Sequence, residues 1–130
     1  MELSELAENI KRSIKTKRIN DNEFQIQTNL FFSDDTPFSV FLMQDKNGNK
    51  IITDKRKTLE YMDEFYELDS NDVKSSIASI LDIYGIKIYQ KALVKKLSST
   101  DDIATIYFEF VSCITQLVNM YVFFDKSDVE

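Results

Sequence analysis

The sequence contains no histidine and only one cysteine, Cys113. One thiol cannot form an intramolecular disulfide, and a thiolate metal site would need its other ligands from elsewhere in the chain. The lack of histidine excludes general-base catalysis by imidazole, and with it the Ser/His/Asp and Cys/His hydrolases and the histidine-ligated zinc and haem enzymes. We therefore predict a chain that holds no cofactor and no metal and that is not an enzyme.

Glycine and proline are also scarce, since the 130 residues include two glycines and one proline. Gly48 and Gly85 are isolated, so no glycine-rich loop is present to bind phosphates, which argues against nucleotide-dependent enzymes. No linker, repeat or low-complexity stretch divides the chain. Its length suits one core, and we predict a single α+β domain over residues 1–130.

Neither a leader nor a membrane span is expected. Residues 1–5 carry acids where a signal peptide needs bases. Residues 103–124 have the length of a membrane span, but their polar residues recur every three or four positions, which lays them along one stripe of a helix. This pattern is typical of a buried helix with one solvent-exposed edge, and we expect a cytoplasmic protein. The stripe consists of Thr105, Glu109, Ser112, Gln116 and Asn119.

The charge is unbalanced toward acids. The chain has 22 acidic and 16 basic residues and a formal net charge of −6. This balance disfavours long-range attraction to nucleic acid or to an anionic membrane. It favours a protein partner, particularly a basic one.

The first half of the chain predicts one helix followed by a meander. Apolar residues at helical spacing and acids early in the segment predict a helix over residues 3–16. From Phe24 the apolar period changes to two, which predicts a strand that continues to Phe32. A strand over residues 38–44, a tight turn at Asn47-Gly48 and a strand over residues 51–53 complete a three-stranded meander.

The second half predicts three helices and a second hairpin. The order is then α-β-β-β-α-α-β-β-α, with an antiparallel sheet packed against the helices. A short helix spans residues 58–66, and the next begins at a cap formed by Asp69 or Ser70 and ends at Gly85. Strands over residues 86–90 and 92–97 form the hairpin, and the last helix starts at Ser99 or Thr100.

The segment between the meander and the first of these helices resembles a known family. Ile52 to Leu59 reads Ile-Thr-Asp-Lys-Arg-Lys-Thr-Leu. It is similar to the Thr-Asp-Asp-Gly-x-Thr-Leu segment of the bacterial and phage proteins grouped as domain of unknown function 1828. Lys55 and Arg56 stand where that family tends to have Asp and Gly. The resemblance implies a phage or mobile-element context and a bacterial host, and it implies no established activity.

Two aspartates around the first hairpin could belong to a metal-dependent nuclease. Magnesium prefers carboxylate oxygens, and Asp45, Asp54 and Lys55 flank the hairpin. The Glu-x-Lys spacing expected on a nuclease strand is absent, however. The favoured interpretation is that Asp45 and Asp54 end strands and cap the turn or helix after each strand, as short polar side chains commonly do.

A run of acids forms the candidate partner-binding site. Such a surface, here mixed with Tyr61 and Tyr66, can imitate phosphate spacing and occupy the basic groove of a nuclease. The alternative is a solvated helix face followed by a helix cap. The six acids are Glu60, Asp63, Glu64, Glu67, Asp69 and Asp72.

Basic residues are also clustered in the sequence. If folding joined the two clusters, they could bind phosphates, although ordinary lysines at a helix end also explain the first cluster. The clusters are Lys11, Arg12, Lys15, Lys17 and Arg18, and then Lys50, Lys55, Arg56 and Lys57.

The last predicted helix is apolar around most of its circumference. Either it runs through the middle of the fold, or a second copy of the chain covers an interface that includes Phe108, Met120 and Phe123. Cys113 on this helix is expected to be a small buried side chain, because no neighbouring base suggests an activated thiolate.

The sequence as a whole predicts a non-catalytic protein that binds another macromolecule. Its most specific form is a phage or mobile-element inhibitor, of the anti-CRISPR or anti-restriction type, that blocks a host nuclease or nucleoprotein with its acidic face. The alternatives are a nucleic-acid-processing domain, including a degenerate nuclease with Asp54 as a metal ligand, and a structural homodimer.

Overall fold

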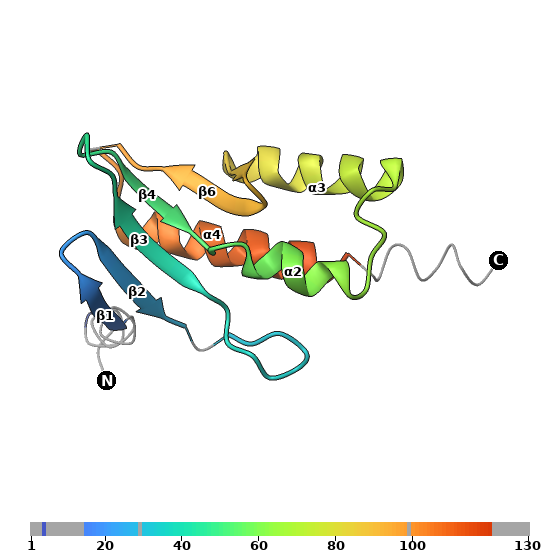
Figure 1. Cartoon of the computed structure of the whole chain (residues 1–130), viewed down its shortest axis with the longest axis horizontal. Coiled ribbons are helices and arrows are strands. Elements are labelled where there is room, and N and C mark those ends of the chain that lie inside the picture. The colour runs from blue at the N-terminus through green and yellow to red at the C-terminus, as the bar shows by residue number, and fades with distance from the viewer. Residues whose placement is uncertain (1–3, 5–14, 29, 99, 121–130) are drawn as a thin grey trace.

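The structure is a computed structural model that describes residue 4 and residues 15–28, 30–98 and 100–120. These residues form one six-stranded antiparallel sheet with helices packed on it, so the predicted α+β class is confirmed (Figure 1). The strands are β1 (Lys15–Asn20), β2 (Glu23–Gln27), β3 (Val40–Gln44), β4 (Lys50–Thr53), β5 (Lys87–Tyr89) and β6 (Ala92–Lys96). The helices are α2 (Lys57–Asp63), α3 (Asn71–Tyr84) and α4 (Ile103–Val118).

The strands are arranged in the order β1-β2-β3-β4-β6-β5. The predicted meander is β2-β3-β4 and the predicted second hairpin is β5-β6, each with antiparallel pairing. The chain leaves the sheet after β4, passes through α2 and α3, and returns so that β6 pairs with β4, with Thr53 opposite Val94. The predicted element order is therefore correct from β2 to α4.

The beginning of the described chain differs from the prediction. The helix predicted over residues 3–16 falls almost entirely outside the described residues, and Lys15 already belongs to β1. β1 forms a hairpin with β2, with Thr16 opposite Ile26 and Arg18 opposite Phe24. All six β1 side chains are exposed, so the strand lacks the apolar alternation that predicts one.

The strand predicted from Phe24 to Phe32 ends early, at Gln27. Residues 30–38 turn back on themselves instead, because Asp34 accepts a hydrogen bond from the Thr36 N–H and the Phe32 N–H donates to the Thr36 carbonyl. An isolated bridge between Phe31 and Pro37 closes this loop. Its consequence is that Phe32 is buried while Phe31 is 56% exposed.

The helix ends follow their capping residues. The Ser70 side chain accepts a hydrogen bond from the Val73 N–H and caps α3, which ends at Gly85 with a φ of 64°. Both of these predictions are confirmed. The last helix starts later than predicted, because Asp102 and not Ser99 or Thr100 is its cap, accepting hydrogen bonds from the Ala104 N–H and the Thr105 hydroxyl.

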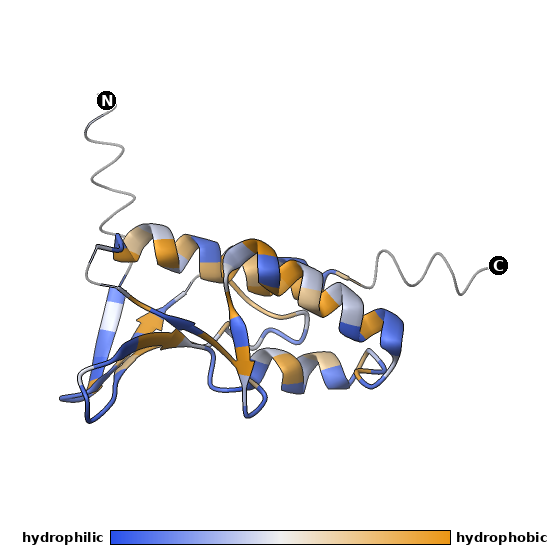
Figure 2. Cartoon of the chain, turned by 90° about the horizontal axis from the view of Figure 1, so that it is seen from above, coloured by the Kyte–Doolittle hydropathy of each residue, from blue (hydrophilic) through white to orange (hydrophobic). Residues whose placement is uncertain are grey.

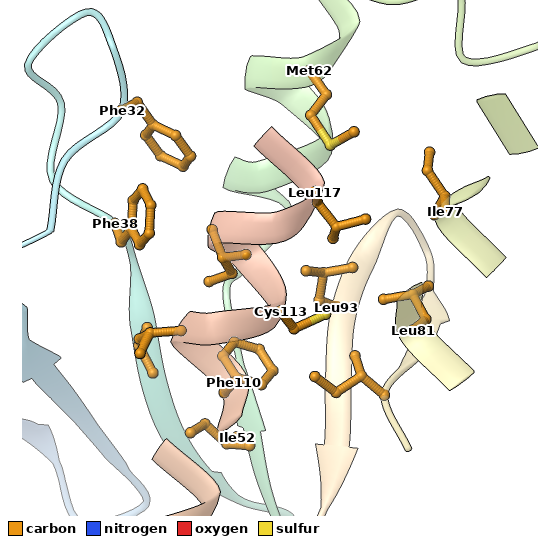
Figure 3. Packing of buried hydrophobic residues seen from close by; sticks show 14 of the residues in the cluster. Phe32, Phe38, Ile52, Met62, Ile77, Leu81, Leu93, Phe110, Cys113 and Leu117 are labelled. Carbon is orange, nitrogen blue, oxygen red and sulfur yellow. The ribbon is translucent and has the colours of Figure 1, made fainter. Parts of the chain in front are cut away.

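The core lies between one face of the sheet and the helices. The strand register places Ile26, Val40, Ile52 and Leu93 on this inner face, and they form one buried cluster with residues of α4. Figure 3 shows Phe110, Cys113 and Leu117 of α4 among Ile52 and Leu93 of the sheet and Ile77 and Leu81 of α3. The predicted polar stripe of α4 lies away from the core, and α3 packs on another side of α4. α4 is thus the central helix of the fold.

The opposite, outer face of the sheet has a different character. Figure 2 shows the long helices on one side of the strands and the other side open. At the centre of this outer face Phe41 lies opposite Thr53 and Met43 lies opposite Ile51; Thr53 is buried and the other three are half-buried. In the described part of the chain no helix combines the length and apolarity that a membrane crossing requires.

Candidate functional site

The six predicted acids lie together on one continuous segment, which we call the acidic segment (residues 60–72). Glu60 and Asp63 are in α2, Glu64 is its C-cap, and Asp72 is in the first turn of α3. All six side chains are exposed, including those of Glu67 and Asp69 in the connection. No lysine or arginine occurs from residue 58 to residue 73. The fold therefore keeps these charges together at its surface.

Part of this charge has a structural explanation. Glu60 forms an ion pair with Lys57 at 3.5 Å, with both side chains more than half exposed. Asp72 lies at the positive end of the α3 dipole, where a negative charge is favourable. Among the described residues only Glu60 of the six is in an ion pair. Of the six acids, Asp63, Glu64, Glu67 and Asp69 thus have neither an ion pair among the described residues nor a place in the first turn of α3.

An aromatic groove borders the acidic segment, and the sequence did not predict it. The groove has a volume of about 570 Å³ and lies between the 30–38 loop, α2 with the turn after it, and the carboxyl end of α4. The centres of the Tyr61 and Phe65 rings are 5.0 Å apart. The centres of the Tyr61 and Phe32 rings are 4.5 Å apart, and this contact joins α2 to the loop. The available signal was the pairing of Tyr61 with Phe65 at helical spacing. Its lining residues are Leu30, Phe31, Phe32, Ser33, Phe38, Tyr61, Phe65, Tyr66, Thr115, Val118 and Asn119.

Asp54 is a structural capping residue. Its side chain is fully buried, and its two oxygens accept hydrogen bonds from the backbone N–H groups of Arg56 at 3.0 Å, Thr58 at 2.9 Å and Leu93 at 2.9 Å. The first two donors belong to the start of α2, and the third belongs to β6. Asp54 thus caps the start of the helix, as the capping interpretation predicted, and it also ties the helix to the sheet, which was not predicted.

Asp45 caps the hairpin at the other end of β4. Its carboxylate accepts from the N–H of Asn47 and from the backbone and side-chain N–H groups of Asn49. The hydrogen bonds from Asn49 hold the pKa of Asp45 below its ordinary value. The four residues of β4 separate Asn49 from Asp54, and the five steps along the chain span roughly 17 Å at about 3.3 Å per residue, so Asp45 and Asp54 do not share a metal site.

In the described part of the chain, no three acidic, cysteine or histidine side chains lie close enough together to hold a metal ion. Lys55, the third residue of the nuclease hypothesis, forms an ion pair with Glu23 and lies 4.2 Å from the centre of the Phe41 ring. It therefore covers the outer face of the sheet, and among the described residues its ion pair is with Glu23 and with neither aspartate of the hypothesis.

The basic residues are only partly brought together. Lys11 and Arg12 fall outside the described residues, while Arg18 pairs with Asp21 and Lys57 with Glu60. The strand register places several lysines around the outer face of the sheet, on the side away from α4. These lysines are Lys15, Lys17, Lys55, Lys87 and Lys96. The acidic segment thus lies on α2, the start of α3 and the connection between them, whereas these lysines lie around the outer face of the sheet.

The three predicted dimer residues have different environments. Phe108 is 47% exposed and stacks on Tyr107, with the ring centres 5.4 Å apart. Met120 is 1% exposed and belongs to the core, so its burial requires no second copy of the chain. Phe123 lies outside the described residues. Phe108 is thus the one described residue of the three with surface to offer a partner.

Cys113 is buried in the core, as predicted. Burial raises the pKa of its thiol to about 12, and the negative charge of Asp54 acts in the same direction. We expect the folded chain to resist a thiol-specific reagent at pH 8, because the thiolate population is about 1,000-fold below that of a thiol with an unshifted pKa. Full reaction after unfolding in guanidinium is the matched control, and rapid reaction of the folded chain would contradict the burial.

The same shift has a consequence for stability. The thiol is protonated to a higher pH in the folded than in the unfolded chain, so its contribution to folding is present below the unshifted pKa of 9.0 and is lost as the pH rises toward about 12.

Comparison with known proteins does not assign the chain to a family. The chain matches no family model, and neither a curated protein nor a solved structure is significantly similar to it. The resemblance to the family of domain of unknown function 1828 therefore stays a prediction from the sequence.

Proposed function

We propose that this chain is a non-catalytic binding protein whose acidic segment binds a basic surface of a protein partner. The observation that carries the proposal is the set of six exposed acids from Glu60 to Asp72, with no lysine or arginine between them; among the described residues only Glu60 of the six is in an ion pair. Side chains that a fold does not need for its own stability are free to serve recognition.

The distribution of charge supports this proposal. Complementary charge speeds and orients encounter with a partner, and it rejects surfaces of the same sign. The acidic segment would attract a basic surface, whereas the lysines around the outer face of the sheet would repel it. A basic partner would therefore approach the helical side of the molecule.

The most specific form of the proposal is an inhibitor. Nucleases and other nucleic-acid-binding proteins carry basic grooves that accept phosphates, and a row of carboxylates can occupy such a groove. A phage or mobile-element origin, which the resemblance implies, would place the chain in the cytoplasm of a bacterial host and its partner among the host nucleases or nucleoproteins.

We expect the amide variant Glu60→Gln, Asp63→Asn, Glu64→Gln and Glu67→Gln to lose its partner. Affinity capture from a nuclease-treated bacterial lysate identifies the partner with the unaltered chain, and titration of the purified pair then measures the loss, expected to exceed about 10-fold. Weaker steering accounts for part of this loss, and unpaired cations left on the partner account for the rest.

A matched control removes the same number of charges elsewhere. Asp21→Asn, Asp82→Asn, Asp101→Asn and Glu109→Gln change exposed or half-exposed residues outside the acidic segment and should leave the affinity within about twofold. Equal losses from the two variants would mean that net charge alone, and not this segment, governs binding.

A nucleic-acid-binding role is the second candidate, and the lysines on the outer face favour it. Tyr89 on the same face is 67% exposed and could stack on a base. A metal-dependent nuclease is less well supported, because Asp54 has no exposed oxygen to offer a metal. Salt-sensitive binding of a single-stranded oligonucleotide that is lost in a Lys17→Gln and Lys87→Gln variant would favour this second candidate.

A further inference from the structure

The aromatic groove is concave and open to solvent. Its volume of about 570 Å³ lies within the range of about 300–1,000 Å³ that is usual for ligand-binding pockets. Phe31 and Phe65 on its walls are 56% and 58% exposed, and Leu30 is 41% exposed. One exposed apolar side chain is ordinary, but three that converge on one concavity indicate a binding surface.

The walls of the groove are held in place before any partner binds. The Phe32 ring lies 4.7 Å from the Phe38 ring and 4.5 Å from the Tyr61 ring, which joins the loop to α2. The Ser33 N–H donates to the Tyr61 hydroxyl at 3.3 Å, and the two hydroxyls are also hydrogen-bonded. A groove that is already formed does not lose the entropy of ordering its walls when a partner binds.

Exposed acidic residues stand next to groove residues in the sequence on two sides of the groove. On the loop side the exposed Asp34 and Asp35 follow Ser33, and hydrogen bonds from Thr36 hold the pKa of Asp34 below its ordinary value. On the helix side Glu64 precedes Phe65, and Glu67 follows the groove residue Tyr66. No lysine or arginine is among the described residues that line the groove. The complement of this surface is a large apolar group between cations.

We propose that the aromatic groove binds a large apolar side chain of the partner, flanked in the partner chain by lysine or arginine. This inference rests on the proposed function and assigns to the groove most of the binding energy for the partner. In protein interfaces a few buried aromatic or apolar anchors carry most of the binding energy, while charges at the rim act mainly on the association rate. The acidic segment therefore selects a basic segment, and the groove holds it.

The test uses three short peptides and the full-length, ¹⁵N-labelled chain. The peptides are Lys-Lys-Gly-Trp-Gly-Lys-Lys, the same peptide with Ala in place of Trp, and Glu-Glu-Gly-Trp-Gly-Glu-Glu. We expect the basic Trp peptide to bind about 10-fold more tightly than the basic Ala peptide, and the acidic peptide to bind least. The amide shifts should move in residues 30–38, 61–66 and 115–119.

Two variants keep the assignment falsifiable. Phe65→Ser should abolish the preference for Trp over Ala, while Ile83→Ser, which removes a 72% exposed apolar residue of α3 outside the groove, should leave it intact. Phe31→Ser provides a second groove variant. Both groove residues are more than half exposed, so neither substitution removes core packing.

The outcomes separate this inference from the proposed function. If the Ala peptide binds and the amide variant of the acidic segment weakens it, but Trp adds nothing, the groove assignment is wrong and the proposed function stands. If the basic Trp peptide shifts no amide of the groove, the groove assignment is wrong, while the proposed function is decided by the titration of the captured partner against the amide variant. Groove shifts that depend on protein concentration alone would assign the groove to a second copy of the chain and would also overturn the proposal.

Discussion

Replacing Asp54 with alanine is expected to lower the free energy of unfolding by about 4 kcal/mol, a large part of the roughly 5–15 kcal/mol that stabilises a domain. The substitution removes the acceptor of three backbone N–H groups, those of Arg56, Thr58 and Leu93. Because Asp54 is fully buried, water does not replace the lost acceptor without rearrangement of α2 and β6. Urea denaturation followed by circular dichroism measures the change.

Asp45 provides the matched control. It is also an aspartate that accepts three hydrogen bonds, but its side chain is exposed and water can satisfy the donors it leaves. Asp45→Ala should therefore shift the urea midpoint much less than Asp54→Ala. Asp54→Asn, which keeps one acceptor oxygen, should be intermediate. Equal midpoints for the Asp45 and Asp54 variants would contradict the assignment of Asp54 as the residue that joins α2 to the sheet.

Phe110→Ala is expected to lower the free energy of unfolding by about 4 kcal/mol, because it leaves a cavity at the centre of the core. Phe110 of α4 is fully buried and belongs to the same core cluster as Ile52 and Leu93 of the sheet. Phe108 is the control on the same helix, since it is 47% exposed and its replacement by alanine should change stability by less than about 1 kcal/mol.

This pair of variants also tests the predicted homodimer. If α4 is covered within one chain, the unfolding midpoint stays constant over a roughly 20-fold range of protein concentration. A midpoint that rises with concentration, and a rise that Phe108→Ala abolishes, would mean that a second copy covers this side of α4. Met120 takes no part in the comparison because it is buried in the core.

The elements that the sequence predicted correctly are those with local signals. Asn47-Gly48 marks a turn in which Gly48 has a φ of 83°, and Ser70 and Gly85 bound α3 through their own backbone geometry. Polar spacing on α4 predicted its exposed edge for the same reason. In each case the residues that carry the signal also make the structure.

The features that could not be predicted depend on partners distant in the sequence. β1 is exposed throughout, so only its pairing with β2 identifies it as a strand. The second hairpin itself was predicted, but the positive φ of Gln90 and Lys91 at its turn was not, because no glycine marks those positions. The cap by Asp54 has a local part, at Thr58, but its bond to the Leu93 N–H spans 39 residues.

The candidate site divides in the same way. The acidic segment is continuous in sequence and was found there, because exposed charges on a short helix stay close together after folding. The aromatic groove joins residues of three separate segments, from Leu30 through Tyr61 to Asn119. No spacing rule relates them, and only the packing of the 30–38 loop on α2 reveals that the acids border an apolar concavity.

The most direct test of the account is to map where the captured partner contacts the labelled chain, by measuring amide chemical shifts in the complex. We predict that the perturbed amides lie in residues 60–72 and around the aromatic groove, with the outer face of the sheet unaffected. Perturbations confined to β1, β5 and the lysines of that outer face would contradict the central claim that a basic partner binds through the acidic segment.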